Sequence, residues 1–147
     1  MKKAKIYTPV SVFDVEFFEQ EAPETVKNFC SLAERGFYNG LTFFKVVPDF
    51  VIQTGCPKNT GMGDAGYFIK CELHGEHQKH VLGSMSMAHC GRDTGSSQFF
   101  ICLNPRYAQH LNRNHTCFGK IVSSNLQLLN NHQKGDIVEK IEIYEED

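Results

Sequence analysis

Amide, aromatic and basic side chains are interleaved in three short blocks of the chain. These blocks are residues 43–53, 86–91 and 95–101. If they form strands, residues two apart lie on one face, so Gln98 shares a face with Phe100, and Val51 shares one with Gln53. Amides beside apolar side chains describe a shallow pocket whose walls can form hydrogen bonds, which suits a peptide better than a small charged metabolite. The blocks therefore predict a peptide-binding groove.

The same region holds nucleophiles that could instead serve a hydrolase. Cys90 follows His89, and Ser96 and Ser97 stand beside an amide. A hydrolase needs a base beside the nucleophile and a third group that orients the base. The sequence contains no G-x-S-x-G elbow, so we disfavour this class, although a triad dispersed along the chain stays compatible with the sequence.

Two patterns between the blocks resemble ligand sites only in part. His74, His77 and His80 have a spacing that would align three imidazoles on a helix, but Gly75 and Gly83 weaken a helix there. We therefore expect a polar loop with surface histidines, and neither a metal nor another cofactor. The glycine-rich run at residues 61–66 lacks the Lys-Ser/Thr of a phosphate-binding loop, so its glycines are expected to permit tight turns.

Length and composition favour one ordinary globular domain. The 147 residues are 41% hydrophobic and 22% charged, and the formal net charge is −2. No linker or repeat divides them, so we expect a single domain over residues 1–147, and a monomer. The Lys and Arg residues are scattered, which argues against a nucleic-acid partner. No apolar stretch approaches the roughly 20 residues that cross a membrane. With 12 Phe and no Trp, the core is expected to be built on phenylalanine.

The six cysteines bear on compartment and on a further hypothesis for function. No secretory signal is visible, so we expect reduced thiols and a cytoplasmic protein. A thiol-based redox protein stays open as an alternative, although no C-x-x-C pair occurs.

Periodicity predicts the elements that must position the blocks. Residues 22–36 have the spacing of an amphipathic helix, with Pro23 in its first turn and Gly36 at its end, and residues 126–129 have weaker helical character. Strands are expected in one or two segments within 10–17, in two segments within 43–52, and at 84–88, 97–103, 116–122 and 137–144. Residues 54–66 are expected to form a long loop. Seven or eight strands without βαβ alternation favour an antiparallel sheet or barrel.

Taken in order, the blocks resemble the cyclophilin family of peptidyl-prolyl cis-trans isomerases. The resemblance runs from residues 22–29, through 97–101, to His115, Phe118 and Gly119. It implies a mainly β fold, an eight-stranded antiparallel barrel capped by two α-helices, with a proline pocket on the outer face. By motif position, the catalytic residues would be Lys45, Phe50 and Gln53. The substrate-binding residues would be Val51, Ala88, His89, Cys90, Gln98, Phe100, His110, Leu111 and His115.

The chain departs from the family pattern at several of these positions. Phe44 and Lys45 stand where the family has His and the catalytic Arg. Lysine carries a strongly hydrated point charge without the planar fork of arginine, so we expect reduced turnover. Cys56 replaces an Asp, and residues 112–114 replace Asp-Gly-Lys. His110 replaces Trp, which is expected to weaken a cyclosporin-type ligand.

The expected function is isomerisation of X-Pro bonds in client proteins, which assists their folding. The alternative is a chaperone or scaffold module that binds proline with little or no catalysis. Lys45 and Phe44 are the features that favour this alternative.

Overall fold

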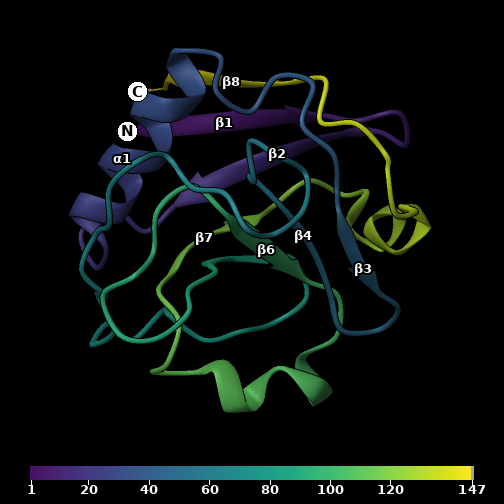
Figure 1. Ribbon diagram of the computed structural model, residues 1–147. Helices are drawn as coiled ribbons and strands as arrows, with labels where there is room; N and C mark the ends of the chain where they lie inside the picture. The colour runs from purple at the N-terminus through teal and green to yellow at the C-terminus, as the bar shows by residue number, and fades with distance from the viewer. Residues whose placement is uncertain (147) are drawn as a thin grey trace.

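Eight strands form one antiparallel sheet in the computed structural model, which describes residues 1–146 (Figure 1). The sheet order is β3-β4-β6-β5-β7-β2-β1-β8. The strands are β1 Lys2–Tyr7, β2 Val12–Phe17, β3 Lys45–Val47, β4 Val51–Thr54, β5 Ser84–Met87, β6 Phe99–Cys102, β7 Cys117–Ile121 and β8 Lys140–Glu145. The expected mainly β, antiparallel fold is confirmed.

The sheet curls until its two edge strands approach each other through the segments that precede them. Thr42, just before β3, forms an antiparallel bridge with Ile137, ahead of β8. The Phe43 N–H donates to the Asp136 carbonyl at 2.9 Å, and the Gly40 N–H donates to the Val138 carbonyl at 2.8 Å. These bonds satisfy backbone groups that an open edge would leave exposed, and they close one end of the barrel.

One α-helix, α1 Pro23–Glu34, covers part of the curled sheet (Figure 1). Its start and its end match the expectation, because Pro23 occupies the first turn and Gly36 has a φ of +77°, a left-handed conformation that suits glycine. The second expected helix forms as a 3-10 helix, η3 Leu126–Asn131. A segment of six residues forms too few hydrogen bonds to offset the free energy of nucleating an α-helix. Tertiary packing of the buried Leu129 holds the segment instead.

Two further 3-10 helices, η1 Pro105–Tyr107 and η2 Gln109–Leu111, follow β6. They lie at the lower end of the barrel in Figure 1. None of the helices within residues 1–146 has the length and apolar content needed to cross a bilayer.

The start of α1 is capped by a residue distant in sequence. No side chain of the preceding residue caps the helix. Instead the Glu72 carboxylate accepts hydrogen bonds from the Thr25 N–H at 2.8 Å, from the Thr25 hydroxyl at 2.7 Å and from the Glu24 N–H at 3.3 Å. A carboxylate at this position satisfies free N–H groups and complements the helix dipole. It also ties the long loop after β4 to α1.

Strand alternation divides the apolar side chains between two clusters. Inward residues such as Ile52, Phe99 and Ile101 join the barrel core, which is built on phenylalanine as expected. Phe29 of α1 packs edge-on against Phe99, with ring centroids 5.2 Å apart. The outward residues of β4 and β6 form a second cluster with the 3-10 segment: Val51, Phe100, Cys102, Ala108 and Leu111. This outer cluster provides the floor of the candidate site.

Candidate active site

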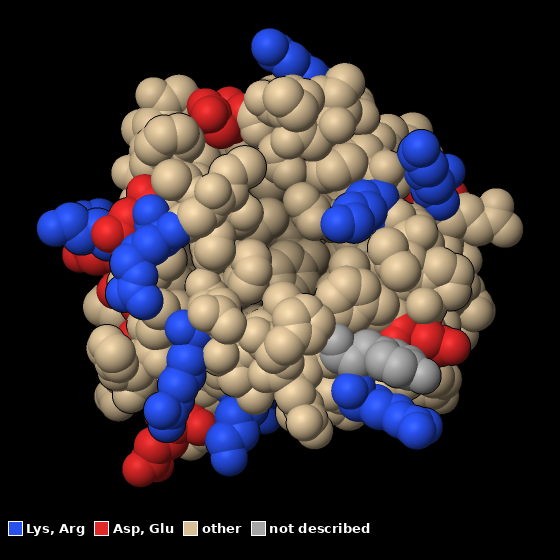
Figure 2. Space-filling model, turned by 60° about the horizontal axis from the view of Figure 1, so that its bottom comes forward, with Lys and Arg blue, Asp and Glu red and all other residues tan. Residues whose placement is uncertain are grey.

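A hollow of about 300 Å³ lies over the outer cluster. Nine of the residues predicted from sequence line it: Lys45, Phe50, Val51, Gln53, Ala88, His89, Phe100, Leu111 and His115. Figure 2, which brings the lower part of Figure 1 forward, shows a hollow surrounded mainly by uncharged side chains. No Asp or Glu is among the lining residues. Nine of the twelve predicted residues therefore gather in one outward concavity.

Strand pairing fixes the floor and one wall of this hollow. Gln53 on β4 lies opposite Phe100 on β6 and opposite Lys45 on β3. This register aligns a cation, an amide and an aromatic ring across three neighbouring strands. Val51 and Phe100 are both 4% exposed, so they present a dense apolar floor and leave little of their own surface free. An apolar floor of this kind suits a proline ring.

The remaining walls come from turns. Phe50 follows Asp49, whose φ is +61°, and its backbone is held by hydrogen bonds to Val47 and Leu103. His110 lies on the outer side of Phe50, with ring centroids 5.9 Å apart, and it is exposed rather than part of the hollow. Leu111, from η2, closes the floor.

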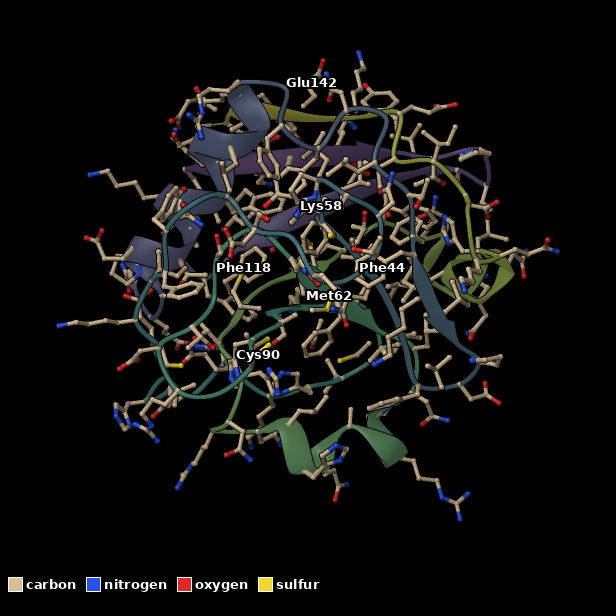
Figure 3. The ribbon with its side chains drawn as sticks, viewed as in Figure 1. Phe44, Lys58, Met62, Cys90, Phe118 and Glu142 are labelled. Carbon is tan, nitrogen blue, oxygen red and sulfur yellow. The ribbon has the colours of Figure 1, made fainter. Side chains whose placement is uncertain are left out.

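A second hollow of about 260 Å³ adjoins the first and shares Gln53, Ala88 and His89 with it. We call the two hollows together the groove. Cys90 and Gln98, which are the remaining predicted residues apart from His110, line this second part. Met62 and Phe68, which were not among the residues predicted from sequence, line it too. Met62 is 85% exposed and lies among the labelled groups of Figure 3. The sequence signal that could have identified these two residues is the presence of large apolar side chains in an otherwise polar, glycine-rich loop.

The two glutamines of the groove are joined by a hydrogen bond. Gln53 Nε2 donates to Gln98 Oε1 at 3.0 Å. Gln98 Nε2 in turn donates to the carbonyls of Gly61 at 3.0 Å and Gly63 at 2.7 Å. Both N–H groups of Gln98 therefore bond to the loop, and its carbonyl oxygen holds the Gln53 amide. Gln53 keeps its own carbonyl oxygen and one N–H for a ligand.

The His115 imidazole forms part of the wall of the first hollow. His115 Nδ1 donates to the Met87 carbonyl at 2.9 Å, and its ring stands edge-on to Phe100 at 5.4 Å. Burial lowers the pKa of His115, and the nearby His89 and His110 lower it further, against the opposing effect of the Met87 bond. The His115 ring is therefore uncharged near neutral pH.

His80 contradicts the expectation of a loop with only surface histidines. His74 and His77 are exposed, and the His77 ring contacts the Glu21 carboxylate at 2.6 Å. His80 is 2% exposed and stacks behind Phe100, with centroids 6.0 Å apart and planes 16° apart. Segment 74–83 is not helical, so it does not align the three imidazoles on one helix face. Residues 1–146 contain no group of three or more His, Cys, Asp or Glu arranged to hold a metal ion.

Lys45 is exposed at the rim of the first hollow, and it is the only Lys or Arg among the lining residues. With no carboxylate in the lining, its charge is not neutralised within the hollow. The six cysteines are free thiols, and only Cys90 is exposed, at the edge of the second hollow.

Comparison with known proteins agrees with this geometry. A family profile described as "Cyclophilin type peptidyl-prolyl cis-trans isomerase/CLD" matches residues 4–146. Peptidyl-prolyl cis-trans isomerase B of Bacillus subtilis is 49% identical over 130 residues, covering 88% of this chain and 89% of that protein. A peptidyl-prolyl cis-trans isomerase of Helicobacter pylori is 48% identical over 139 residues, covering 94% and 84%.

Solved structures are similar as well. The crystal structure of a cyclophilin type peptidyl-prolyl cis-trans isomerase of Cryptosporidium parvum has a TM-score of 0.88 at 28% identity, covering 99% of each chain. A second crystal structure of that protein, in the presence of the dipeptide Ala-Pro, has a TM-score of 0.87 and covers 98% of this chain and 99% of that one.

Fold and geometry thus define an antiparallel β-barrel protein with a groove on its outer face. The chain belongs to the cyclophilin-type peptidyl-prolyl cis-trans isomerase family, and its activity is the cis-trans isomerisation of peptidyl-prolyl bonds.

Proposed function

We propose that the groove isomerises X-Pro bonds in proline-containing segments of client proteins and so assists their folding. The observation that carries the proposal is the alignment of Lys45, Gln53 and Phe100 across three paired strands. In this assignment the proline ring rests on the outer cluster, and the residues before it follow the second hollow past Ala88, His89 and Cys90. The Ala-Pro dipeptide with the Cryptosporidium parvum relative supports this choice of ligand.

The reaction needs no covalent step. Resonance gives the peptide C–N bond a rotation barrier of about 18–20 kcal/mol, and exchange of X-Pro bonds without a catalyst takes tens of seconds or more. In the twisted state resonance is lost, and the proline nitrogen regains a lone pair. A donor placed beside that nitrogen stabilises the twisted state more than the planar one.

Each residue has a defined part in this scheme. Val51, Phe100 and Leu111 anchor the ring, with Phe50 at its side, while the acyl side rotates. Gln53 binds the substrate backbone and is oriented by Gln98. Lys45 supplies the charge and the N–H donors at the rotating amide. A tenfold gain in rate requires only about 1.4 kcal/mol of differential stabilisation.

Lys45 also limits the proposed activity. A lysine ammonium is strongly hydrated, and the exposed Lys45 sits on a flexible stem, so it loses water and rotamer freedom each time it engages the substrate. Turnover below that of an arginine enzyme is the expected consequence. His110, exposed beside Phe50, offers less apolar surface than Trp would, so a cyclosporin-type ligand is expected to bind more weakly than to a His110→Trp variant.

The test is exchange NMR on an X-Pro peptide with catalytic amounts of protein. Wild type should accelerate exchange, and Gln53→Ala should lower kcat/KM about tenfold or more, through lost transition-state contacts worth about 1.4 kcal/mol. Gln127→Ala, at an exposed position of η3 outside the groove, is the matched control and should leave the rate unchanged. Binding of the peptide without accelerated exchange would favour the non-catalytic module. Wild-type rates in Gln53→Ala would remove Gln53 from the site.

A further inference from the structure

A buried imidazole behind the proline-binding floor joins three elements of the site. The His80 ring stacks on Phe100 of β6, and the Ser86 hydroxyl of β5 lies 2.8 Å from its Nε2. On its other side, His80 Nδ1 lies 2.7 Å from Asn112 Oδ1. Asn112 directly follows Leu111 and ends η2, with its N–H donating to the Gln109 carbonyl. His80 itself does not line the groove.

The hydrogen bonds place a proton on one nitrogen of this ring. The His80 backbone N–H also donates to Asn112 Oδ1, at 2.8 Å, and a backbone N–H can only donate, so the atom it contacts must be the amide oxygen. His80 Nδ1 therefore carries a proton, and in the neutral ring Nε2 accepts from the Ser86 hydroxyl. Burial lowers the pKa of His80, with His115 and His110 lowering it further against the opposing Asn112 bond, which is consistent with a neutral ring.

The two bonds from His80 to Asn112 tie the end of a short 3-10 segment to a distant part of the chain, whereas the other hydrogen bonds of this segment are to residues within four positions in sequence. η2 contains three residues, and its only buried side chain is Leu111. A 3-10 turn of this length has weak intrinsic stability, so its position depends on its tertiary contacts. The clamp from His80 acts at the residue next to Leu111, and the stacked ring supports Phe100 from behind.

We propose that His80 is a positioning residue, which sets the proline-binding floor by clamping Asn112 and backing Phe100. It acts through Leu111 and Phe100 and does not touch the substrate. The inference rests on the proposed function, because it assumes that these two side chains bind the proline ring. A floor that holds the ring equally in the planar and twisted states contributes uniform binding, so its loss should raise KM and leave kcat nearly unchanged.

The experiment compares two buried histidines that make similar contacts. His80→Phe keeps an aromatic ring of similar size and removes the polar contacts of both ring nitrogens. His132→Phe is the matched control, since His132 is 4% exposed, contacts Leu129 O and Thr8 Oγ1 through its two ring nitrogens, and packs on Phe13 and Phe43 away from the groove. We expect KM for an X-Pro peptide to rise about tenfold in His80→Phe and to stay at the wild-type value in His132→Phe, with kcat within about twofold in both.

A second pair of variants tests the contact itself and covers the case in which His80→Phe fails to fold. Asn112→Ala removes the acceptor and should reproduce the rise in KM, whereas Asn112→Asp keeps a carboxylate oxygen there and should restore most of the affinity. The double variant His80→Phe/Asn112→Ala should cost no more than either single change, because both remove one interaction. The methyl resonances of Leu111 should shift in His80→Phe and Asn112→Ala without any peptide present.

Each outcome of these experiments either supports or contradicts the positioning role of His80. An unchanged KM with unchanged Leu111 methyl resonances would overturn the proposal, as would an equal rise in KM in His132→Phe. Leu111 methyl shifts without any change in KM would uphold the clamp and count against the proposed function, since the floor would then move without affecting the substrate.

Discussion

The imidazole rings of His89 and His115 stack in parallel at the edge of the first hollow, with centroids 4.0 Å apart and planes 10° apart. His89 is held by donating from Nε2 to the Asn114 carbonyl at 2.7 Å, and it accepts from the Gly91 N–H at Nδ1. His115 is held by Met87. Both rings are thus fixed by backbone groups, and a proton added to either would place a charge against the other.

Replacing His89 by Asn should raise the pH at which His115 titrates. Burial is the largest cause of the lowered pKa of His115, and the neighbouring His89 lowers it further. Removing that ring reduces both effects, so the midpoint should move up toward the ordinary value near 6.5. NMR titration of the His115 ring proton measures this midpoint. In the pH profile of kcat/KM, the acid limb should move to higher pH as well. His74→Asn, at an exposed site outside the groove, should move neither. An unshifted midpoint in His89→Asn would contradict the prediction.

Changing Lys45 to Arg should raise kcat/KM on an X-Pro peptide. Arginine offers a planar fork of N–H donors and is more weakly hydrated than an ammonium, so more of its interaction energy is available in the twisted state. A gain of about tenfold corresponds to about 1.4 kcal/mol of transition-state stabilisation. Lys120→Arg, an exposed position on β7, serves as the control. Measurable wild-type activity with no gain in Lys45→Arg would show that Lys45 is not the key donor.

Much of the fold could be predicted from the sequence, because an element that buries only one face shows a strong periodicity of apolar residues. In α1, Val26, Phe29, Cys30 and Ala33 recur at helical spacing and are all buried. β1 was missed because its lysines dominate the composition. Only Ala4 and Ile6 of β1 point into the core, and pairing with β2 and β8 supplies the rest of its stability.

The groove could be predicted only for residues that sit in recognisable blocks. Met62, Phe68 and His80 lie in the long loop after β4, where no periodicity relates sequence position to direction. His80 stacks on Phe100 and contacts Asn112, both distant in sequence, so no local pattern could reveal its burial. The link between Gln53 and Gln98 likewise depends on strand register and not on spacing.

Removing the Glu72 carboxylate should destabilise the fold through α1. Its three contacts satisfy N–H and hydroxyl donors at the helix start, where no local side chain substitutes for it. Glu72→Ala should lower the free energy of unfolding by about 1–2 kcal/mol, the usual cost of losing a helix cap. Glu72→Gln, which keeps an acceptor, should cost less. Denaturant unfolding measures both, with Glu76→Ala, exposed in the same loop, as the control expected to change stability little.

Cys56 should make the stability of the protein rise with pH above neutrality. Burial would raise the pKa of this thiol, but the surrounding loop N–H groups of Thr60, Gly63, Lys58 and Gly61 outweigh that effect and lower the pKa to about 7. The Gly63 N–H lies 3.2 Å from the sulfur. The unfolded chain has no such loop, so its thiol titrates near about 8.5. Between these two values the unfolded state binds more protons than the folded state, and the free energy of unfolding must increase with pH across that window.

The comparison that isolates this effect is wild type against Cys56→Ser. Serine keeps a weak acceptor in the loop but does not ionise in this range, so its stability curve should be flatter between pH 7 and about 8.5. Urea unfolding at several pH values under reducing conditions gives the two curves, and their difference should widen as pH rises. Cys30→Ser controls for loss of a buried thiol, because burial raises the pKa of Cys30 to about 12, outside the window. Parallel curves for wild type and Cys56→Ser would show that the Cys56 thiol stays neutral in the folded protein across this window. The folded protein would then not lower the pKa of Cys56, and the prediction would be wrong.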